Sequence, residues 1–134
     1  SAPEVGDYAV AGGHEADLRE ILALHELSSP IQHISKSEVV KGDVSRSFPA
    51  WLHENPQAVI AMAIFDMDIY EPTRVALEAV LPRLTKGSLL VFDELNTAEF
   101  PGETLALREV LGLDRLRLRN FPHQPGCAYA VWGE

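Results

Sequence analysis

The sequence has 134 residues, of which 46% are hydrophobic and 23% are charged. This composition is typical of one globular domain with one hydrophobic core, and it excludes a multidomain enzyme within these residues. Twenty acidic and eleven basic side chains give a formal net charge of −9, which disfavours nucleic acid or an anionic membrane surface as a partner.

Cysteine content and the length of apolar segments indicate the compartment. Cys127 is the single cysteine, so no internal disulfide can form and the cytosol is the expected location. The longest apolar run, residues 58–65, is far shorter than the roughly 20 residues of a membrane helix. The first residues also lack the basic start and apolar stretch of a signal peptide. We therefore expect a cytoplasmic protein without a membrane anchor.

The first half of the chain predicts two helices and one short strand. Apolar residues three, four and seven positions apart predict a helix over 15–27, with His25 on its buried stripe. Two adjacent valines before a Gly-Asp pair predict a short strand over 38–41. Aromatic and apolar residues on one side predict a short amphipathic helix over 48–54.

The middle of the chain alternates strand and helix patterns. The apolar run 58–65 predicts a strand covered on both faces, as in a parallel sheet. A helix is expected over 73–84, with Pro72 at its start, followed by a second apolar strand over 88–92. Residues 103–111 predict another helix. This order predicts parallel strands joined by right-handed crossovers.

The end of the chain predicts an antiparallel hairpin. Residues 115–119 alternate with a period of two, and residues 127–132 are rich in strand formers. The sequence therefore predicts the α/β class, with a Rossmann-like, mostly parallel sheet flanked by helices and a C-terminal antiparallel hairpin. We expect residues 1–134 to form a single domain.

Acidic side chains follow both predicted central strands. Asp66 and Asp68 come directly after the first strand, and Asp93 and Glu94 follow the second. Ligands of open parallel sheets bind beyond the carboxyl ends of the strands, and neighbouring strands lie roughly 5 Å apart. Asp68, Asp93 and Glu94 could therefore hold one hard cation such as Mg²⁺. The alternative is that these acids are solvated or cap the following helices.

Other chemistries fit the pattern less well. An Asp-x-Asp pair after an apolar strand also occurs in metal-dependent glycosyltransferases, which normally require a much longer chain, and in aspartyl-phosphate phosphatases, whose pattern differs at position 70. The five histidines show no zinc-ligand spacing. His14 and His123 are loop residues that could act as a general base or lie solvated on the surface. Cys127 is expected to be packed within a strand rather than reactive.

Four segments together resemble the class I S-adenosylmethionine-dependent methyltransferases of the macrocin O-methyltransferase-like group, which act on hydroxyls of sugars and sugar-bearing natural products. They are Lys-Gly-Asp-Val at 41–44, Ile-Phe-Asp-Met-Asp-Ile-Tyr-Glu-Pro-Thr at 64–73, Pro-Arg-Leu-Thr-Lys-Gly-Ser-Leu-Leu-Val-Phe-Asp-Glu at 82–94 and Pro-Gly-Glu-Thr-Leu-Ala at 101–106. The resemblance covers residues 8–132, roughly the C-terminal two-thirds of such a domain.

The resemblance implies a role for several acids. It places divalent metal ligands, with Mg²⁺ as the candidate ion, at Asp68, Asp93 and Glu94, although the family more often has two aspartates where this chain has Asp93 and Glu94. It places Asp43 near the adenine of S-adenosylmethionine and Asp66 beside the methyl-transfer pocket. Asp66 or His14 would then accept the proton of the substrate hydroxyl.

The chain departs from the family pattern at its start. Residues 1–13 contain no Glu-x-Gly-x-x-x-Gly motif and no apolar run that could form the first strand of a complete methyltransferase. The resemblance implies that this strand would lie between those ending at Asp43 and Asp66. We therefore expect a truncated catalytic portion that binds the cofactor weakly, has no turnover alone and self-associates through the open sheet edge. The alternative is a non-catalytic α/β module.

Overall fold

The computed structural model describes residues 12–134. The expected absence of a first strand and glycine motif concerns mainly residues 1–11, which lie outside this range. Within the described range the elements follow in this order: α1 (His14–Leu27), α2 (Val44–Glu54), β1 (Ile60–Phe65), α3 (Tyr70–Val80), the 3₁₀ turn η1 (Leu81–Arg83), β2 (Leu84–Phe92), α4 (Gly102–Val110), β3 (Arg119–Phe121) and β4 (Gln124–Val131). None of these helices has the length and apolar content needed to cross a bilayer.

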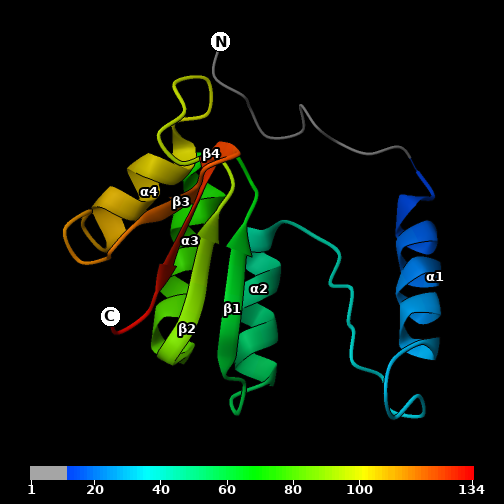
Figure 1. Ribbon diagram of the computed structural model, residues 1–134. Helices are drawn as coiled ribbons and strands as arrows, with labels where there is room; N and C mark the ends of the chain where they lie inside the picture. Colours follow the sequence, from blue (N-terminus) through cyan, green and yellow to red (C-terminus); the bar gives the residue numbers. More distant parts are fainter. Residues whose placement is uncertain (1–11) are drawn as a thin grey trace.

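The four strands form one mixed sheet in the order β1-β2-β4-β3. β1 and β2 are parallel and are joined through α3, whereas β4 runs antiparallel to both β2 and β3. The α/β class and the C-terminal hairpin predicted from the sequence are therefore confirmed. Because β1 and β2 are parallel neighbours, their carboxyl ends lie at the same edge of the sheet (Figure 1).

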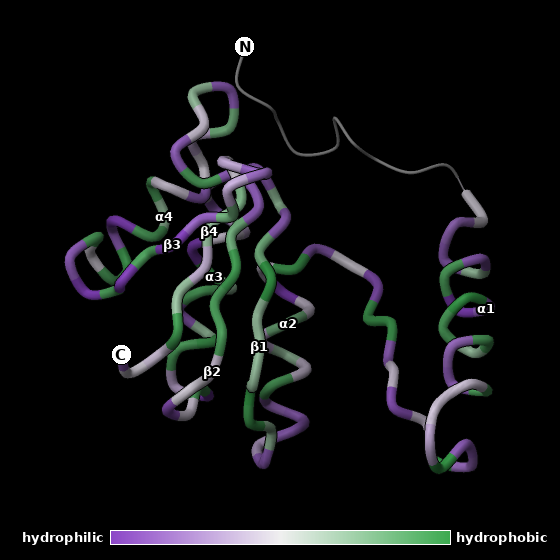
Figure 2. Tube along the Cα trace, in the orientation of Figure 1, coloured by the Kyte–Doolittle hydropathy of each residue, from purple (hydrophilic) through white to green (hydrophobic). Residues whose placement is uncertain are grey.

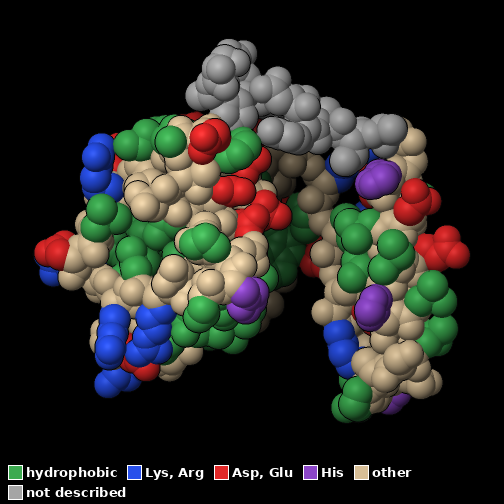
Figure 3. All heavy atoms as spheres, turned by 45° about the horizontal axis from the view of Figure 1, so that its top comes forward, with side chains coloured by type: hydrophobic (Ala, Val, Ile, Leu, Met, Phe, Trp, Pro, Cys, Tyr) green, Lys and Arg blue, Asp and Glu red, His purple; other side chains and the backbone are tan. Residues whose placement is uncertain are grey.

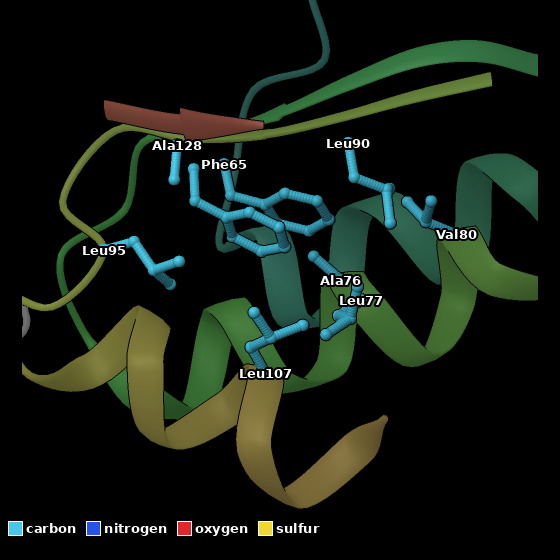
Figure 4. Close-up of a cluster of buried hydrophobic side chains, with 9 residues drawn as sticks. Phe65, Ala76, Leu77, Val80, Leu90, Leu95, Leu107 and Ala128 are labelled. Atoms are coloured by element: carbon cyan, nitrogen blue, oxygen red, sulfur yellow. The ribbon is translucent and has the colours of Figure 1, made fainter. Parts of the chain in front are cut away.

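The hydrophobic core lies between one face of the sheet and the helices α2, α3 and α4 (Figure 1). The rings of Phe65 in β1 and Phe92 in β2 stack with centroids 4.9 Å apart. Leu77 of α3 and Leu107 of α4 are fully buried against this pair, as Figure 4 shows. Fully burying a side chain of this size contributes about 1.5–3 kcal/mol. These contacts hold the two central strands and two helices as one unit.

The expectation that residues 58–65 are covered on both faces is wrong. Met62 and Ile64 are 52% and 65% exposed, on the face of β1 that points away from the helices. Within residues 12–134 no helix packs on this face, and β1 is the edge strand of the sheet. In Figure 2 most of β1 is green, the colour of hydrophobic residues, and α2 lies between β1 and the more distant α1.

The helix predicted over 15–27 is confirmed as α1, but its expected buried stripe is wrong. None of the 14 residues of α1 is buried, and His25 is exposed. α1 stands apart from the sheet in Figure 1, at the end of an extended segment. Its polar contacts run to that segment: Glu26 Oε1 accepts bonds from the backbone amides of Lys36 and Ser37, both at 2.9 Å. Periodicity identified an apolar face, and no element of the described residues 12–134 buries that face.

The strand predicted over 38–41 does not form. This segment is extended, but no strand of the described residues lies beside it, so it has no ladder partner. Its polar groups pair instead with neighbouring helices. Trp51 Nε1 donates to Glu38 at 2.7 Å, and Arg19 donates to the carbonyl of Val39 at 3.1 Å. These contacts tie the segment to α2 on one side and to α1 on the other.

Several boundaries also differ from the prediction. α2 begins at Val44, before the predicted 48, because Asp43 caps it: its carboxylate accepts from the amide of Ser45 at 2.9 Å. α3 begins at Tyr70 and ends at Val80, where a 3₁₀ turn replaces the end of the predicted helix. Of residues 115–119 only Arg119 is in a strand, because the preceding backbone turns and the leucines of this segment pack on the core cluster without a ladder.

Candidate functional site

The carboxyl ends of β1 and β2 form the candidate site. Phe65 and Phe92, the last residues of the two strands, are register partners, and the amide of Asp93 donates to the carbonyl of Phe65 at 3.1 Å. The predicted proximity of the two strand ends is therefore confirmed. Figure 3, which turns this edge forward, shows acidic side chains gathered beside the open space between the sheet and α1.

Asp68 is the most constrained residue of this edge. Its backbone has φ = +58°, a left-handed conformation that is uncommon outside glycine. Burial, followed by the charges of Asp66 and Asp93, raises the pKa of the Asp68 carboxyl above its ordinary value. Asp66, Asp68 and Asp93 are therefore close enough to repel one another, and Asp66 is the exposed member of the three.

Asp93 and Glu94 also lie beside the start of β4. Gln124 Nε2 is 3.5 Å from Asp93 Oδ1, and a Cβ placed on Gly126 would lie 3.8 Å from Glu94 Oε2. The next residue, Cys127, is buried as predicted for a packed thiol. Burial raises the pKa of Cys127, and the charges of Asp93 and Glu103 add to this effect. The hairpin strand therefore forms one wall of the acidic edge.

Glu103 belongs to the site and was missed by the sequence analysis. Its side chain is fully buried in the first turn of α4, and burial raises its pKa to about 7. Oε2 accepts from the amide of Glu94 at 3.2 Å, whereas Oε1 has no hydrogen-bond partner. Helical periodicity assigned the buried face to Leu107, Val110 and Leu111 and gave no role to Glu103. No local pattern marked this glutamate, because acids are common in a first helical turn, where the helix dipole stabilises them.

The predicted metal ligands provide the right donor chemistry. Asp68, Asp93 and Glu94 offer the hard carboxylate oxygens that Mg²⁺ prefers, and the repulsion among the acids would be relieved by a cation. As the side chains stand, no three His, Cys, Asp or Glu residues among positions 12–134 are grouped tightly enough to hold an ion. The role of these three residues as ligands stays a prediction.

The other predicted residues lie away from the acidic edge or at its border. Asp43 is exposed. Its neighbours in the sequence, Gly42 and Val44, line an open groove of about 800 Å³ between α2 and the extended segment before it. His14 is exposed at the start of α1, across the open space in Figure 1, so the structure does not bring it to Asp66. His123 is exposed in the β3–β4 turn, next to Gln124.

Comparison with solved structures decides the family. The chain superposes on the crystal structure of CalS11, a calicheamicin methyltransferase, with a TM-score of 0.94 and 49% identity over 100% of this chain and 52% of that chain. The apo structure of CalS11, described as a TDP-rhamnose 3'-O-methyltransferase, gives a TM-score of 0.88 and 50% identity over 97% of this chain and 56% of that chain. The chain belongs to the class I methyltransferases.

Other methyltransferases agree with this assignment. The curated 8-demethyl-8-(2,3-dimethoxy-alpha-L-rhamnosyl)-tetracenomycin-C 4'-O-methyltransferase of Streptomyces olivaceus is 33% identical over 69% of this chain and 37% of its own length. The O-methyltransferase NovP shares the fold, with a TM-score of 0.58 and 19% identity over 97% of this chain and 55% of that chain. No protein-family model matches the sequence. The chain spans about half the length of its solved relatives.

Proposed function

We propose that the protein carrying this chain transfers a methyl group from S-adenosylmethionine to a hydroxyl of a sugar, either free as a nucleotide sugar or attached to a small molecule. The main support is the cluster of Asp66, Asp68 and Asp93 at the carboxyl edge of the sheet, in a chain that is 50% identical to a TDP-rhamnose 3'-O-methyltransferase over 97% of its residues. The tetracenomycin enzyme also acts on a rhamnosyl group. A rhamnose hydroxyl is therefore the first acceptor to test.

The proposed reaction is a direct displacement. When bound, S-adenosylmethionine would supply a methyl group on a positively charged sulfur. That sulfur is a good leaving group because it departs as a neutral thioether. The bond between the methyl carbon and sulfur would break as the substrate oxygen bonds to that carbon, and a carboxylate of this chain would accept the hydroxyl proton. Asp66 is our candidate for this base, because it is exposed at the end of β1 while His14 lies on the separate helix α1.

The acids around Asp66 would orient the sugar. Asp68, Asp93 and Glu94 are the residues that would hold a divalent cation such as Mg²⁺, which lowers the pKa of a bound hydroxyl when present. Asp43 would lie near the adenine, beside the groove formed with α2, although one of its oxygens already caps that helix. Positioning of the sugar oxygen in line with the methyl group supplies most of the rate enhancement in this scheme.

A methyl-transfer assay with matched variants tests this proposal. TDP-rhamnose, S-adenosylmethionine and Mg²⁺ are supplied to the protein that carries this chain, and methylated sugar is detected by mass spectrometry. Asp66→Asn and Asp68→Asn are expected to lower turnover at least 100-fold, and Glu99→Gln, an exposed acid in the loop before α4, is expected to leave it unchanged. Full activity of both aspartate variants would contradict the assignment.

The isolated chain gives a second test. We expect calorimetric titration of residues 1–134 with S-adenosylmethionine to show weak binding or none, because this chain offers Asp43 and Asp66 but only about half of its relatives' length. Micromolar binding to this chain alone would show instead that it contains a complete cofactor site.

The edge of β1 favours a second property, self-association of the isolated chain. A non-catalytic module would also have this property. The apolar residues Val59, Met62 and Ile64 are 66%, 52% and 65% exposed beside unpaired backbone groups of an edge strand. Such an edge is a template for pairing with another strand. We propose that the isolated chain self-associates through β1, and a light-scattering mass of one chain at micromolar concentration would contradict this.

A further inference from the structure

The start of α4 touches both loops that carry the candidate acids. Gly102 lies against the backbone of residues 68–70: a Cβ at this position would be 2.5 Å from the carbonyl carbon of Ile69 and 2.6 Å from the nitrogen of Tyr70. Contacts this short are not tolerated, so only glycine allows α4 to approach the loop after β1 so closely. The first turn of α4 therefore fixes the loop in which Asp68 adopts its left-handed conformation.

The next two residues of α4 reach the loop after β2. Glu103 Oε2 accepts from the amide of Glu94 at 3.2 Å, and Thr104 Oγ1 accepts from the amide of Asn96 at 2.8 Å. The backbone of Met67, in the loop after β1, favours the charged form of the Glu103 carboxylate and so opposes the rise of its pKa that burial causes. One buried carboxylate thus interacts with backbone groups of both acid-bearing loops.

Stability alone does not explain a glutamate at this position. The side chain of Glu103 is fully buried, and its Oε1 has no hydrogen-bond partner. A buried polar atom without a partner is unfavourable, whereas an apolar residue of similar shape would avoid this cost. A role in arranging the two loops accounts for both the burial and the two backbone interactions.

We propose that Glu103 is a positioning residue that fixes the loop after β2 against the loop after β1, and so sets the separation of Asp68 and Asp93. It touches neither substrate nor cofactor in this proposal. The use of that separation for binding a cation or a sugar rests on the proposed function, but the coupling of the two loops does not.

Hydrogen–deuterium exchange of single amides, measured by NMR on the full chain, tests the coupling directly. The amides of Met67 and Glu94 lie beyond the strand ends, yet they are expected to exchange at least tenfold more slowly than the amide of the exposed loop residue Ala98. Equal exchange at these three sites would overturn the proposal. This measurement needs no variant, so it decides the question even if substitutions of Glu103 prevent folding.

Glu103→Gln keeps the size of the side chain and removes one carboxylate oxygen. We expect it to accelerate exchange at Met67 and Glu94 at least tenfold and to leave Leu90, in the middle of β2, unchanged, while Glu99→Gln alters none of them. Uniform acceleration across the sheet would show a merely structural role and overturn the proposal.

Binding of Mn²⁺, followed by electron paramagnetic resonance, separates this inference from the proposed function. Glu103→Gln is expected to raise the Mn²⁺ dissociation constant at least fivefold, and Glu99→Gln to leave it unchanged. Unaltered Mn²⁺ affinity in Glu103→Gln would overturn the claim that Glu103 sets the spacing of the acids. If the unsubstituted chain binds no Mn²⁺, this result contradicts the predicted metal site but not the positioning role of Glu103. The exchange rates then confirm or overturn that role.

Discussion

Phe65 and Phe92 are register partners in the two parallel strands, and their rings stack at 4.9 Å with an angle of 10° between the planes. Each is followed directly by an aspartate, Asp66 or Asp93. The core contact that joins the strands therefore also places the first acid of each loop at the same edge of the sheet. The stability of the core and the geometry of the candidate site depend on the same pair.

Phe92→Ala is expected to destabilise the protein strongly, because it empties a site that is fully buried beneath three helices. Truncation of a buried phenylalanine costs about 3–5 kcal/mol. Chemical denaturation should show this loss, and Phe121→Ala serves as the control, since Phe121 is 38% exposed at the sheet's far edge. Equal losses for the two variants would contradict the assigned core.

Gly102→Ala is expected to disturb the loop that contains Asp68, since a Cβ would overlap the backbone of residues 68–70. Overpacking of this kind costs about 1–3 kcal/mol. NMR amide shifts should change at Asp68–Tyr70 and the melting temperature should fall. Gly12→Ala is the matched control because a Cβ there meets nothing within 4 Å. Unchanged shifts in Gly102→Ala would mean that the helix does not lie where the structure has it.

The raised pKa of Glu103 predicts that the free energy of unfolding depends on pH. Its pKa is raised from 4.5 to about 7 in the folded state, chiefly by burial, so the folded protein binds this proton more tightly than the unfolded chain. The associated stability is present below about pH 4.5 and is lost as the pH rises to about 7, with a total on the order of 3 kcal/mol. Denaturation curves of Glu103→Gln should lack this slope, whereas those of Glu99→Gln should retain it.

Asp68→Asn is expected to stabilise the fold slightly at pH 8. The raised pKa of Asp68 shows that its charge is unfavourable in the folded state, and asparagine keeps the shape and tolerates the left-handed backbone. The gain in unfolding free energy should be roughly 0.5 kcal/mol at pH 8 and absent at pH 3, where the aspartate is protonated in both states. Asp114→Asn, at an exposed site, should show no such gain.

Ile64→Lys is expected to reduce self-association of the isolated chain while leaving its folding unchanged. Ile64 is 65% exposed on the open face of β1, and a charge at an edge strand opposes pairing. Sedimentation should show a shift toward monomer. Leu113→Lys, which introduces the same charge at a residue 44% exposed outside the strands, should leave the mass distribution unaltered. An equal shift in both variants would indicate a general effect of charge.

Local sequence patterns predicted most of the elements that form and the acids that follow the two central strands. Periodicity predicted α1, α3 and α4, continuous apolar runs predicted β1 and β2, and the acids after those runs predicted the candidate site. These features depend on neighbours within a few residues, which is why a linear pattern contains them.

Only the tertiary structure decided what covers each element. It left α1 and the outer face of β1 uncovered, kept residues 38–41 from pairing, and buried Glu103 between two loops. Burial and ladder pairing depend on segments remote in the chain, and no local pattern states whether such a partner is present. A glutamate in a first helical turn is usually solvated, and only the close approach of α4 through Gly102 gives Glu103 its place between the acidic loops.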